Sequence, residues 1–400
     1  MQIKGNKLYL GGIRAEHLVR QYGSPLYVYE EDIIVKRYKE LVENIRYKKL
    51  KLYYACKANT NLEILKLLRK QGAGIEAVSE GEILLAFKAG FRPQDIIYTC
   101  DNIPEEELKF LVKNKITVNI DSFSQLEKYG KLNHGGSVGI RINQGIGAGH
   151  HTHCITGGPN SKFGIYFSRT EEIKRAAKQC GLKIIGIHQH IGSGTLDEKI
   201  FIKAMRALLR TAKKFEDLEF IDFGGGFGIP YKPGEKALDI KKLGKHITNL
   251  FTDFCQSYGK ELAMFFEPGR YIVAEAGVLL TRVVDIKRTP FKIFVGVDSG
   301  FNHLIRPIMY GAYHKILNAS CVEGPKEVVS VAGNICESGD LFAKDRKITK
   351  FKEGDILAIL DAGAYGFVQS SNFNSRPRPA EVLVKNGKSR LIRKREKLDC

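Results

Sequence analysis

The sequence predicts an α/β protein built from a (β/α)8 TIM barrel and a mostly β domain. Between residues 25 and 275, eight strand-like runs alternate with helix-period segments, which is the pattern of parallel barrels. After residue 275, strand-like runs follow one another with little helical periodicity between them. We therefore predict a barrel over 25–275 and a β domain formed by 1–24 and 276–400. An open doubly wound sheet is the alternative, because one sequence does not give the strand order.

The predicted barrel strands are short runs rich in β-branched and aromatic residues. They lie at 51–55, 75–79, 96–99, 117–120, 137–143, 183–190, 220–223 and 263–267, with helices that include 62–70, 81–89, 104–113 and 170–180. Thr170 is predicted to cap the last of these helices, and Gly181 to end it. In the second domain we expect strands at 278–286, 291–297, 327–331, 355–359 and 380–384, with 7–10 joining them.

The composition is that of a soluble globular chain, with 43% hydrophobic and 27% charged residues among 400. No apolar run approaches the length of a membrane span, and the first residues lack the apolar core of a signal peptide. The eight cysteines include no C-x-x-C pair and are expected to be reduced thiols. We expect a cytoplasmic protein without a membrane partner.

The chain is strongly basic, since 63 Lys and Arg against 44 Asp and Glu give a net charge of +19. Such a charge attracts anions, including phosphorylated cofactors and nucleic acid. The excess is spread along the chain, and its one concentrated stretch, 385–397, alternates with Leu391 and Ile392. This alternation favours a solvated strand edge over a nucleic-acid arm. We therefore predict no nucleic-acid partner.

Chemically useful side chains follow the predicted barrel strands, at the end where TIM barrels carry their active sites. Lys57 follows the first strand, Arg141 ends the fifth, and His190 and Ser193 follow the sixth. Gly224, Gly225 and Gly226 follow the seventh strand, and Glu267, Pro268, Gly269 and Arg270 follow the eighth.

Each of these residues has two interpretations when taken alone. Lys57 is either a surface lysine or a strand-end amine that binds an aldehyde. The glycines 224–226 form either a tight turn or a phosphate-binding loop, and they lack the last glycine of a dinucleotide fingerprint. His190 is either a hydrogen-bonded core histidine or a ring stacked on a flat cofactor. Glu267 either makes a local salt bridge or holds a proton on a heterocyclic nitrogen.

A metal site is the competing interpretation. His150, His151, His153 and Cys154 crowd one segment, and His188 and His190 follow. Their spacing matches no structural zinc pattern, and the glycines at 145, 147 and 149 instead indicate a mobile loop over the barrel mouth. We predict no metal.

Together, an amine, two phosphate-binding turns, a stacking ring and a carboxylate satisfy the requirements of pyridoxal 5'-phosphate. The carboxylate would keep the pyridine nitrogen protonated, which makes the ring an electron sink. The β domain adds a second set of residues. Arg306 suits bidentate carboxylate binding, and Tyr310 is one helical turn away. Cys336 is either inert core or a proton donor, and its polar neighbours favour the donor.

These motifs resemble the fold-type III pyridoxal-phosphate-dependent decarboxylases over nearly the whole chain. The resemblance rests on Tyr54-Ala-Cys-Lys57-Ala-Asn59, His190-Ile-Gly-Ser193, Gly224-Gly-Gly226, Glu267-Pro-Gly-Arg270, Leu304-Ile-Arg306-Pro307, Cys336-Glu-Ser-Gly-Asp340, Asp361-Ala-Gly-Ala-Tyr365-Gly and the segment 371–381. Glu76 stands where many members have Asp, and we expect this departure not to touch the core chemistry.

The resemblance implies roles for the residues of both domains. Lys57 would hold the cofactor covalently, His190 would stack on its ring, Glu267 would pair with the pyridine nitrogen, and Arg141 would lie near the ring hydroxyl. The phosphate and its surroundings would be bound by Ser193, Gly224, Gly225, Gly226, Pro268, Gly269, Arg270 and Tyr365. The small amino-acid substrate would be bound by Arg270, Arg306, Tyr310, Glu337 and Tyr365, and Cys336 would protonate Cα.

The expected reaction is decarboxylation of meso-2,6-diaminopimelate to L-lysine, in a homodimer whose subunits share their active sites through Cys336 and Glu337. An arginine at the distal site fits a substrate with a second carboxylate, which a simple diamine precursor lacks. The alternatives are a decarboxylase of ornithine, lysine, arginine or carboxynorspermidine, a racemase on the same barrel, and a non-enzymatic cofactor-binding protein.

Overall fold

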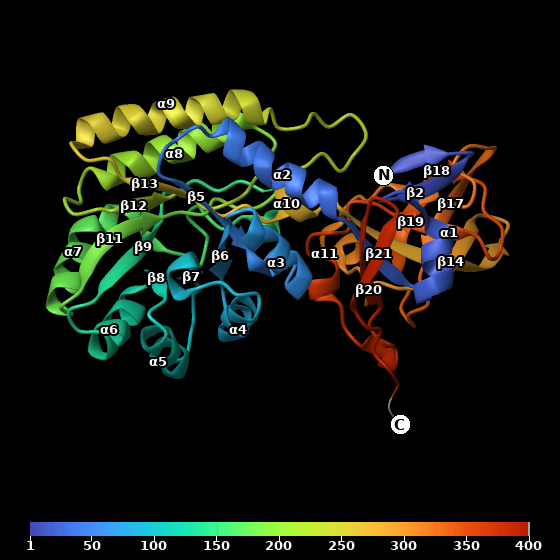
Figure 1. Ribbon diagram of the computed structural model, residues 1–400, viewed down its shortest axis with the longest axis horizontal. Coiled ribbons are helices and arrows are strands. Elements are labelled where there is room, and N and C mark those ends of the chain that lie inside the picture. The colour runs from blue at the N-terminus through green and yellow to red at the C-terminus, as the bar shows by residue number, and fades with distance from the viewer. Residues whose placement is uncertain (150, 399–400) are drawn as a thin grey trace. The chain divides into compact units, whose positions relative to one another are not determined.

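The computed structural model describes residues 1–149 and 151–398 of the chain, which form two compact units (Figure 1). The barrel unit contains Arg37–Ile229 and Lys236–Tyr271. The β unit contains Met1–Lys36, Pro230–Glu235 and the described chain from Ile272 onward. No helix in the described part of the chain is long and apolar enough to cross a membrane.

The barrel unit is a closed ring of eight parallel strands (Figure 1). In ring order they are β5 (Leu50–Ala55), β6 (Gly74–Ala77), β7 (Ile96–Thr99), β8 (Thr117–Ile120), β9 (Ser137–Asn143), β11 (Lys183–His188), β12 (Phe220–Asp222) and β13 (Ala263–Phe266). Closure is made by β13, which pairs in parallel with β5, so that Phe266 lies opposite Leu52. This pairing confirms the predicted barrel over the open sheet. The short β10 (Ile165–Tyr166) pairs with β9.

Helices alternate with these strands, as the sequence predicts. They are α3 (Leu62–Lys70), α4 (Glu80–Lys88), α5 (Glu105–Lys113), α6 (Phe123–Leu132), α7 (Thr170–Gln179), α8 (Glu198–Ala212) and α9 (Ile240–Tyr258), with α2 (Glu31–Asn44) and α10 (Arg270–Val273) at unit boundaries. Side chains of Asn61, Ser79 and Ser122 accept N–H groups at helix starts, which satisfies otherwise orphaned donors. The predicted Thr170 cap is wrong: Arg169 is the N-cap, and the Thr170 hydroxyl donates to the Phe167 carbonyl instead.

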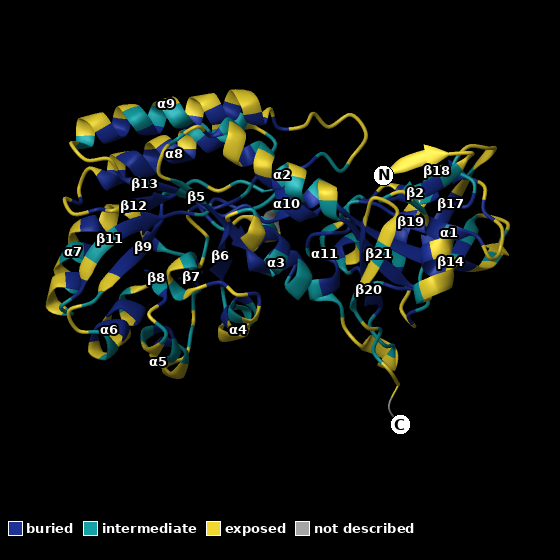
Figure 2. Cartoon of the chain, viewed as in Figure 1, coloured by how far each residue is buried: buried dark blue, intermediate teal, exposed yellow. Residues whose placement is uncertain are grey.

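Figure 2 shows that the barrel strands consist largely of buried residues. Phe220 stacks on Phe265 with their ring centroids 4.8 Å apart. Gly186 leaves room for this ring, since a Cβ there would lie 2.1 Å from Phe220. The barrel is therefore a packed core, and its polar groups are confined to the strand ends.

The β unit is a mixed sheet in the order β18-β17-β15-β14-β4-β20-β21, and β19 lies off this path, paired with β14 on one side and β16 on the other. Its strands are β4 (Leu26–Glu30), β14 (Gly277–Arg288), β15 (Ile293–Val297), β16 (Ile316–Asn318), β17 (Lys326–Ala332), β18 (Leu341–Thr349), β19 (Ile356–Ile359), β20 (Ala380–Lys385) and β21 (Lys388–Arg393). A small sheet contains β1 (Gln2–Lys4), β2 (Lys7–Leu10) and β3 (Ile13–Arg14), and the helices are α1 (Ala15–Tyr22) and α11 (Arg306–Tyr310).

The N-terminal strand β4 is central in this sheet. It pairs antiparallel with β14 and parallel with β20, and all five of its residues are buried. The predicted barrel begins at residue 25, whereas the barrel unit begins at Arg37 because β4 pairs within the β unit. The basic segment 385–397 contains β21, the edge strand of the sheet, as its alternating pattern predicts.

Candidate active site

The predicted barrel residues lie together at the carboxyl ends of the strands. Lys57 lies in a 3-10 turn, η1 (Cys56–Ala58), directly after β5. Its Nζ forms an ion pair with Glu76 at the end of β6. Burial raises the pKa of Glu76 to about 7, although the nearby Lys57 charge acts to lower it. The departure at Glu76 therefore affects a contact of Lys57 itself, and its neutrality for the core chemistry stays a prediction.

His190 is held against the glycine run. The Gly225 N–H donates to His190 Nδ1 over 3.0 Å. Burial, reinforced by the charges of Lys57 and Arg141, lowers the pKa of His190 to about 3. The ring is therefore neutral at pH 7, with its remaining proton on Nε2.

The glycine run forms a closely packed turn, the glycine cradle, in which an added side chain would collide with neighbouring backbone. A Cβ at Gly224 would lie 2.3 Å from the Gln189 carbonyl oxygen, and one at Gly225 would lie 2.2 Å from the carbonyl oxygen of Glu267. Gly224 and Gly226 also adopt positive φ of 68° and 104°, which side-chain-bearing residues rarely do. Glycine is required here because the backbones of three strand ends approach closely.

Ser193 and Arg270 are brought together. The guanidinium donates to the Ser193 hydroxyl from Nε over 3.1 Å and from Nη2 over 3.0 Å. Pro268 accepts a hydrogen bond from the Ala55 N–H over 3.2 Å, and a Cβ at Gly269 would lie 3.1 Å from the Cβ of Ala55, a tight contact. The turn after β13 is therefore fixed against β5.

Arg141, at the end of β9, is buried beside Asp121 with 3.6 Å between Nη1 and Oδ1. Its guanidinium also lies 4.4 Å from the Phe163 ring centroid. Ion pair and cation–π contact together hold this charge in the barrel mouth.

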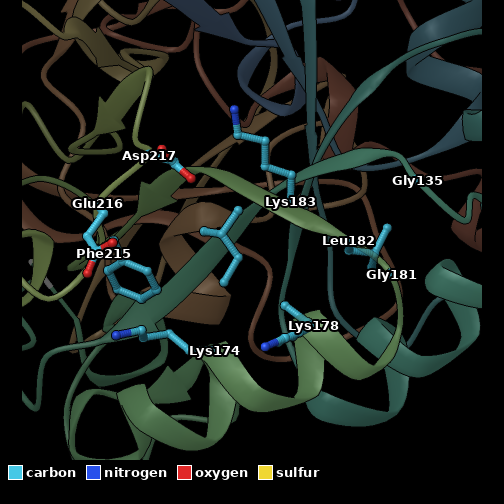
Figure 3. A pocket seen from close by; sticks show the side chains of 11 residues that line it. Gly135, Lys174, Lys178, Gly181, Leu182, Lys183, Phe215, Glu216 and Asp217 are labelled. Carbon is cyan, nitrogen blue, oxygen red and sulfur yellow. The ribbon is translucent and has the colours of Figure 1, made fainter.

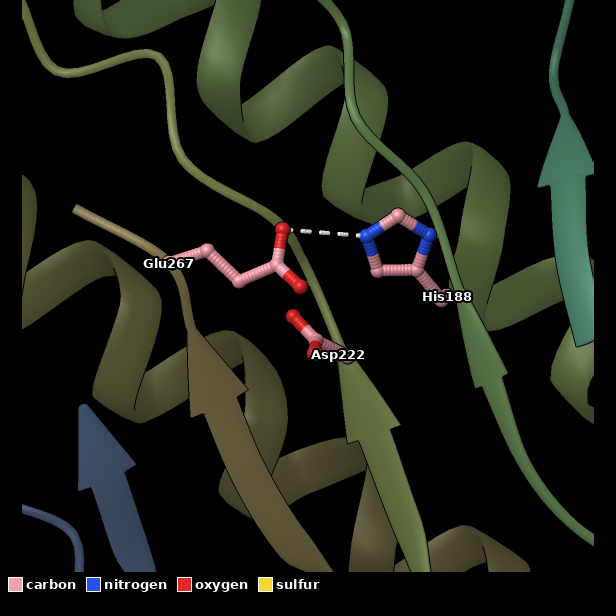
Figure 4. Close-up of side chains that lie close together, drawn as sticks. All are labelled: His188, Asp222 and Glu267. Atoms are coloured by element: carbon pink, nitrogen blue, oxygen red, sulfur yellow. Dashed lines mark hydrogen bonds and ion pairs between the residues drawn. The ribbon is translucent and has the colours of Figure 1, made fainter. Parts of the chain in front are cut away.

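Glu267 lies in a cluster with His188 and Asp222, two residues to which the sequence interpretation gave no cofactor role (Figure 4). His188 and Asp222 are opposite one another in the β11–β12 register, and Glu267 follows β13. His188 Nε2 lies 3.1 Å from Glu267 Oε2. Their positions in the sequence could have predicted this cluster, because each residue ends or follows one of three strands that are adjacent in the barrel. Of the predicted metal alternatives, His150 lies outside the described residues.

The β unit places its predicted residues on three segments. Arg306 and Tyr310 are the first and last residues of α11, and Arg306 is buried. Its guanidinium carbon lies 4.7 Å from the Tyr231 ring centroid. Tyr365 has a positive φ of 55° in the loop after β19.

Cys336 and Glu337 are exposed, as the polar surroundings of the cysteine predict. They lie in a turn held by Asp340, whose carboxylate accepts the N–H groups of Ile335 over 2.8 Å and Phe301 over 2.7 Å. Cys336 itself donates its N–H to the Asn374 side chain over 2.8 Å. The thiol therefore sits on an ordered turn at the surface of the β unit.

A separate pocket lies at the opposite end of the barrel (Figure 3). It is lined by Lys183, which begins β11, and by Lys174 and Lys178 of α7, together with Glu216 and Asp217. None of the predicted site residues lines it. The chemistry of this chain is concentrated at the other end of the strands.

The barrel mouth has the groups that pyridoxal phosphate requires. The glycine turn packs closely against neighbouring strand ends, and the paired Ser193 hydroxyl and Arg270 guanidinium offer donors that suit a phosphate. Lys57 supplies an amine, His190 a neutral ring, and Glu267 a buried carboxylate. The fold and this set of side chains define a class of protein, barrel enzymes that bind pyridoxal phosphate at the strand ends.

Comparison with known proteins agrees with this class. Residues 31–274 match the family described as pyridoxal-dependent decarboxylase, pyridoxal binding domain. The diaminopimelate decarboxylase of Methanothermobacter thermautotrophicus is 48% identical over 98% of this chain and 94% of its own length, and that of Aquifex aeolicus is 38% identical over 100% and 96%. A crystal structure of the M. jannaschii diaminopimelate decarboxylase with L-lysine has a TM-score of 0.92 at 34% identity, covering 99% of this chain and 95% of that one. The chain belongs to the pyridoxal-dependent decarboxylase family, and its cofactor is pyridoxal phosphate.

Proposed function

We propose that this protein decarboxylates meso-2,6-diaminopimelate to L-lysine and carbon dioxide, the last step of lysine biosynthesis by the diaminopimelate route. The observation that carries the proposal is the set of Lys57, His190, the glycine cradle and Glu267 at one barrel mouth, in a chain 48% identical to a diaminopimelate decarboxylase. Bound pyridoxal phosphate supplies a conjugated ring that accepts the electrons left when carbon dioxide departs.

Lys57 holds the cofactor through its amine, which must first lose a proton. Glu76 is paired with Lys57 Nζ and has a pKa of about 7, so its carboxylate is a base of suitable strength for that proton. Glu267 would pair its buried negative charge with the protonated pyridine nitrogen. His190 would stack on the ring, and Arg141 would lie near its hydroxyl.

The phosphate is bound by Ser193, the glycine run, the Pro268-Gly269-Arg270 turn and Tyr365. Ser193 already accepts two hydrogen bonds from Arg270, so the hydroxyl and the guanidinium act as one anion-binding unit.

Substrate choice rests on charge. Diaminopimelate presents a carboxylate and an ammonium at its distal end. Arg306 and Arg270 bind the carboxylate, Glu337 binds the ammonium, and Tyr310 and Tyr365 complete the site. Lysine and ornithine lack the distal carboxylate, so a buried arginine would be left without an anion.

Cys336 donates the proton that replaces the departing carboxyl group at Cα. The exposure of Cys336 and Glu337 supports a homodimer in which each subunit completes its partner's site. The seven described cysteines are all free, which supports a reducing, cytoplasmic location.

The test is carbon dioxide release from meso-diaminopimelate, ornithine, lysine, arginine and carboxynorspermidine, each added to the purified holoenzyme. We expect turnover of diaminopimelate alone, and we expect Arg306→Lys to raise its KM while the exposed Arg20→Lys leaves it unchanged. Preference for any diamine precursor would refute the proposed substrate.

A further inference from the structure

Two buried carboxyl oxygens face each other in the barrel mouth without a hydrogen-bond donor between them. Oδ2 of Asp222 and Oε1 of Glu267 have no hydrogen-bond partner within the described chain. Figure 4 shows the two carboxyl groups pointing toward one another from neighbouring strand ends. Asp222 is 0% exposed and Glu267 is 4% exposed, so both carboxyl groups are shielded from bulk solvent.

The other oxygen of each group is satisfied. Asp222 Oδ1 accepts the Gly224 N–H over 2.9 Å, and Glu267 Oε2 lies 3.1 Å from His188 Nε2. Only the two oxygens that face each other therefore lack a hydrogen-bond donor. Two buried carboxylates at such close quarters repel one another, whereas one shared proton turns the repulsion into a hydrogen bond.

The surroundings decide which group holds that proton. Burial and the charge of Glu267 raise the pKa of Asp222 well above its usual value. Burial alone would also raise the pKa of Glu267, but the charge and hydrogen bond of His188 and the charge of Lys57 lower it to about 2. Burial lowers the pKa of His188, whereas the Glu267 carboxylate acts to raise it, and Nε2 donates to Glu267 in either charge state of the ring.

The charged groups that face the cluster come from several elements. Lys57 follows β5, Glu76 ends β6, Arg141 lies in β9, and His190 follows β11. The two cations favour an anion at Glu267, and Glu76 disfavours a second anion at Asp222. The arrangement therefore has one stable charge pattern, with Asp222 neutral and Glu267 ionised.

We propose that Asp222 is a carboxylic acid at neutral pH that donates from Oδ2 to Oε1 of Glu267. With His188 it forms a pair of buried donors that keep Glu267 anionic and fix its orientation toward the pyridine nitrogen. Asp222 is a positioning residue, since it acts through Glu267. This inference rests on the proposed role of Glu267.

Infrared difference spectroscopy of the holoenzyme tests the protonation state without measuring activity. Wild-type protein with ¹³C-labelled aspartate is compared with Asp222→Asn at pH 7. We expect a protonated-carboxyl band that shifts with the aspartate label and is absent in the variant. Absence of such a band in the wild type, or a band that shifts only with labelled glutamate, would overturn the proposal. Either result leaves the substrate assay unaffected, so the two proposals fail separately.

Rescue by a neutral donor is the second measurement. Asp222→Asn keeps an N–H donor toward Glu267 and should retain kcat within about tenfold, whereas Asp222→Ala should lose about a hundredfold, as for other lost buried donors. The ¹⁵N resonance of labelled cofactor should report a protonated ring nitrogen in wild type and in Asp222→Asn, and a weaker protonation in Asp222→Ala. Asp217→Asn, at the opposite barrel end, is the control. Equal loss in the Asn and Ala variants would refute a donor role, and Asp222→Asn alone decides the case if the Ala variant does not fold.

Discussion

His314 Nε2 lies 2.8 Å from Nη1 of Arg306, and Nδ1 of the same ring lies 2.8 Å from the Leu360 carbonyl oxygen. Because a carbonyl only accepts, Nδ1 carries the proton and Nε2 accepts from the guanidinium. The ring also packs edge-on against Tyr231, on which Arg306 is stacked. The direction of the buried guanidinium is thus set by a neutral histidine.

Replacing this histidine should weaken binding of the distal carboxylate. We expect His314→Phe to raise the KM for diaminopimelate by roughly ten- to a hundredfold, the effect of losing a hydrogen bond to a charged group, with a smaller change in kcat. His314→Gln keeps an acceptor and should recover much of the loss. Steady-state kinetics beside the exposed His17→Gln gives the comparison, and an unchanged KM in His314→Phe would contradict it.

The covalent attachment point follows from the strand-end position of Lys57. Borohydride reduction of the holoenzyme should fix the cofactor to this lysine, because reduction turns the carbon–nitrogen double bond into a stable amine. Peptide mapping should find the label on the peptide that contains Lys57, and Lys57→Ala should take up none. A label on another lysine would show that the assignment is wrong.

The buried Glu76 should make stability depend on pH. Its folded-state pKa is raised from 4.5 to about 7, mainly by burial, so the folded protein binds a proton that the unfolded chain has released. Its contribution to stability is fully present below about pH 4.5 and is lost as pH rises through about 7. Glu76→Gln should remove this slope from the melting temperatures of cofactor-free protein. A parallel pH profile in the variant would mean that Glu76 is ionised throughout.

Loss of the thiol at Cys336 should slow the reaction after the cofactor has bound. We expect Cys336→Ala to retain the cofactor absorption band but to lose about a hundredfold or more in kcat, the range for a missing general acid. Cys321→Ala is a matched control. Full turnover by Cys336→Ala would assign the proton to another group.

Subunit complementation should reveal the shared site. Lys57→Ala and Cys336→Ala are each expected to be nearly inactive, and mixed dimers would carry one site with both residues intact. After co-refolding, activity should return to about a quarter of the wild-type value, because half of the dimers are mixed. No recovery, with mixed dimers verified by tagging, would place Lys57 and Cys336 in the same subunit's site.

The sequence predicts the barrel and its strand ends well because both depend on local patterns. Alternation of short strands and helices is visible along the chain, and the four strands 96–99, 117–120, 137–143 and 7–10 have the bounds that were predicted. Lys57, His190 and the glycine run follow strands, so their gathering at one end requires only a parallel barrel.

Contacts between residues that are far apart in the sequence cannot be predicted from such local patterns. The pairing of Glu76 with Lys57 and the approach of Asp222 to Glu267 depend on the curvature of the closed sheet. Single carboxylates at strand ends have no sequence pattern of their own. The same holds for β4, which is placed with the barrel by its position in the chain although Val28 pairs with Val278.

That central position of β4 has a consequence for biosynthesis. The strand leaves the ribosome before any of the barrel, but its neighbours β14 and β20 are translated after the barrel. While the barrel is being synthesised, the apolar strand β4 is part of the nascent chain and has no partner strand on either edge. Termination of translation before Ala380 therefore leaves an apolar edge of β4 exposed. We expect chaperones to cover this edge until β20 and β21 have been synthesised.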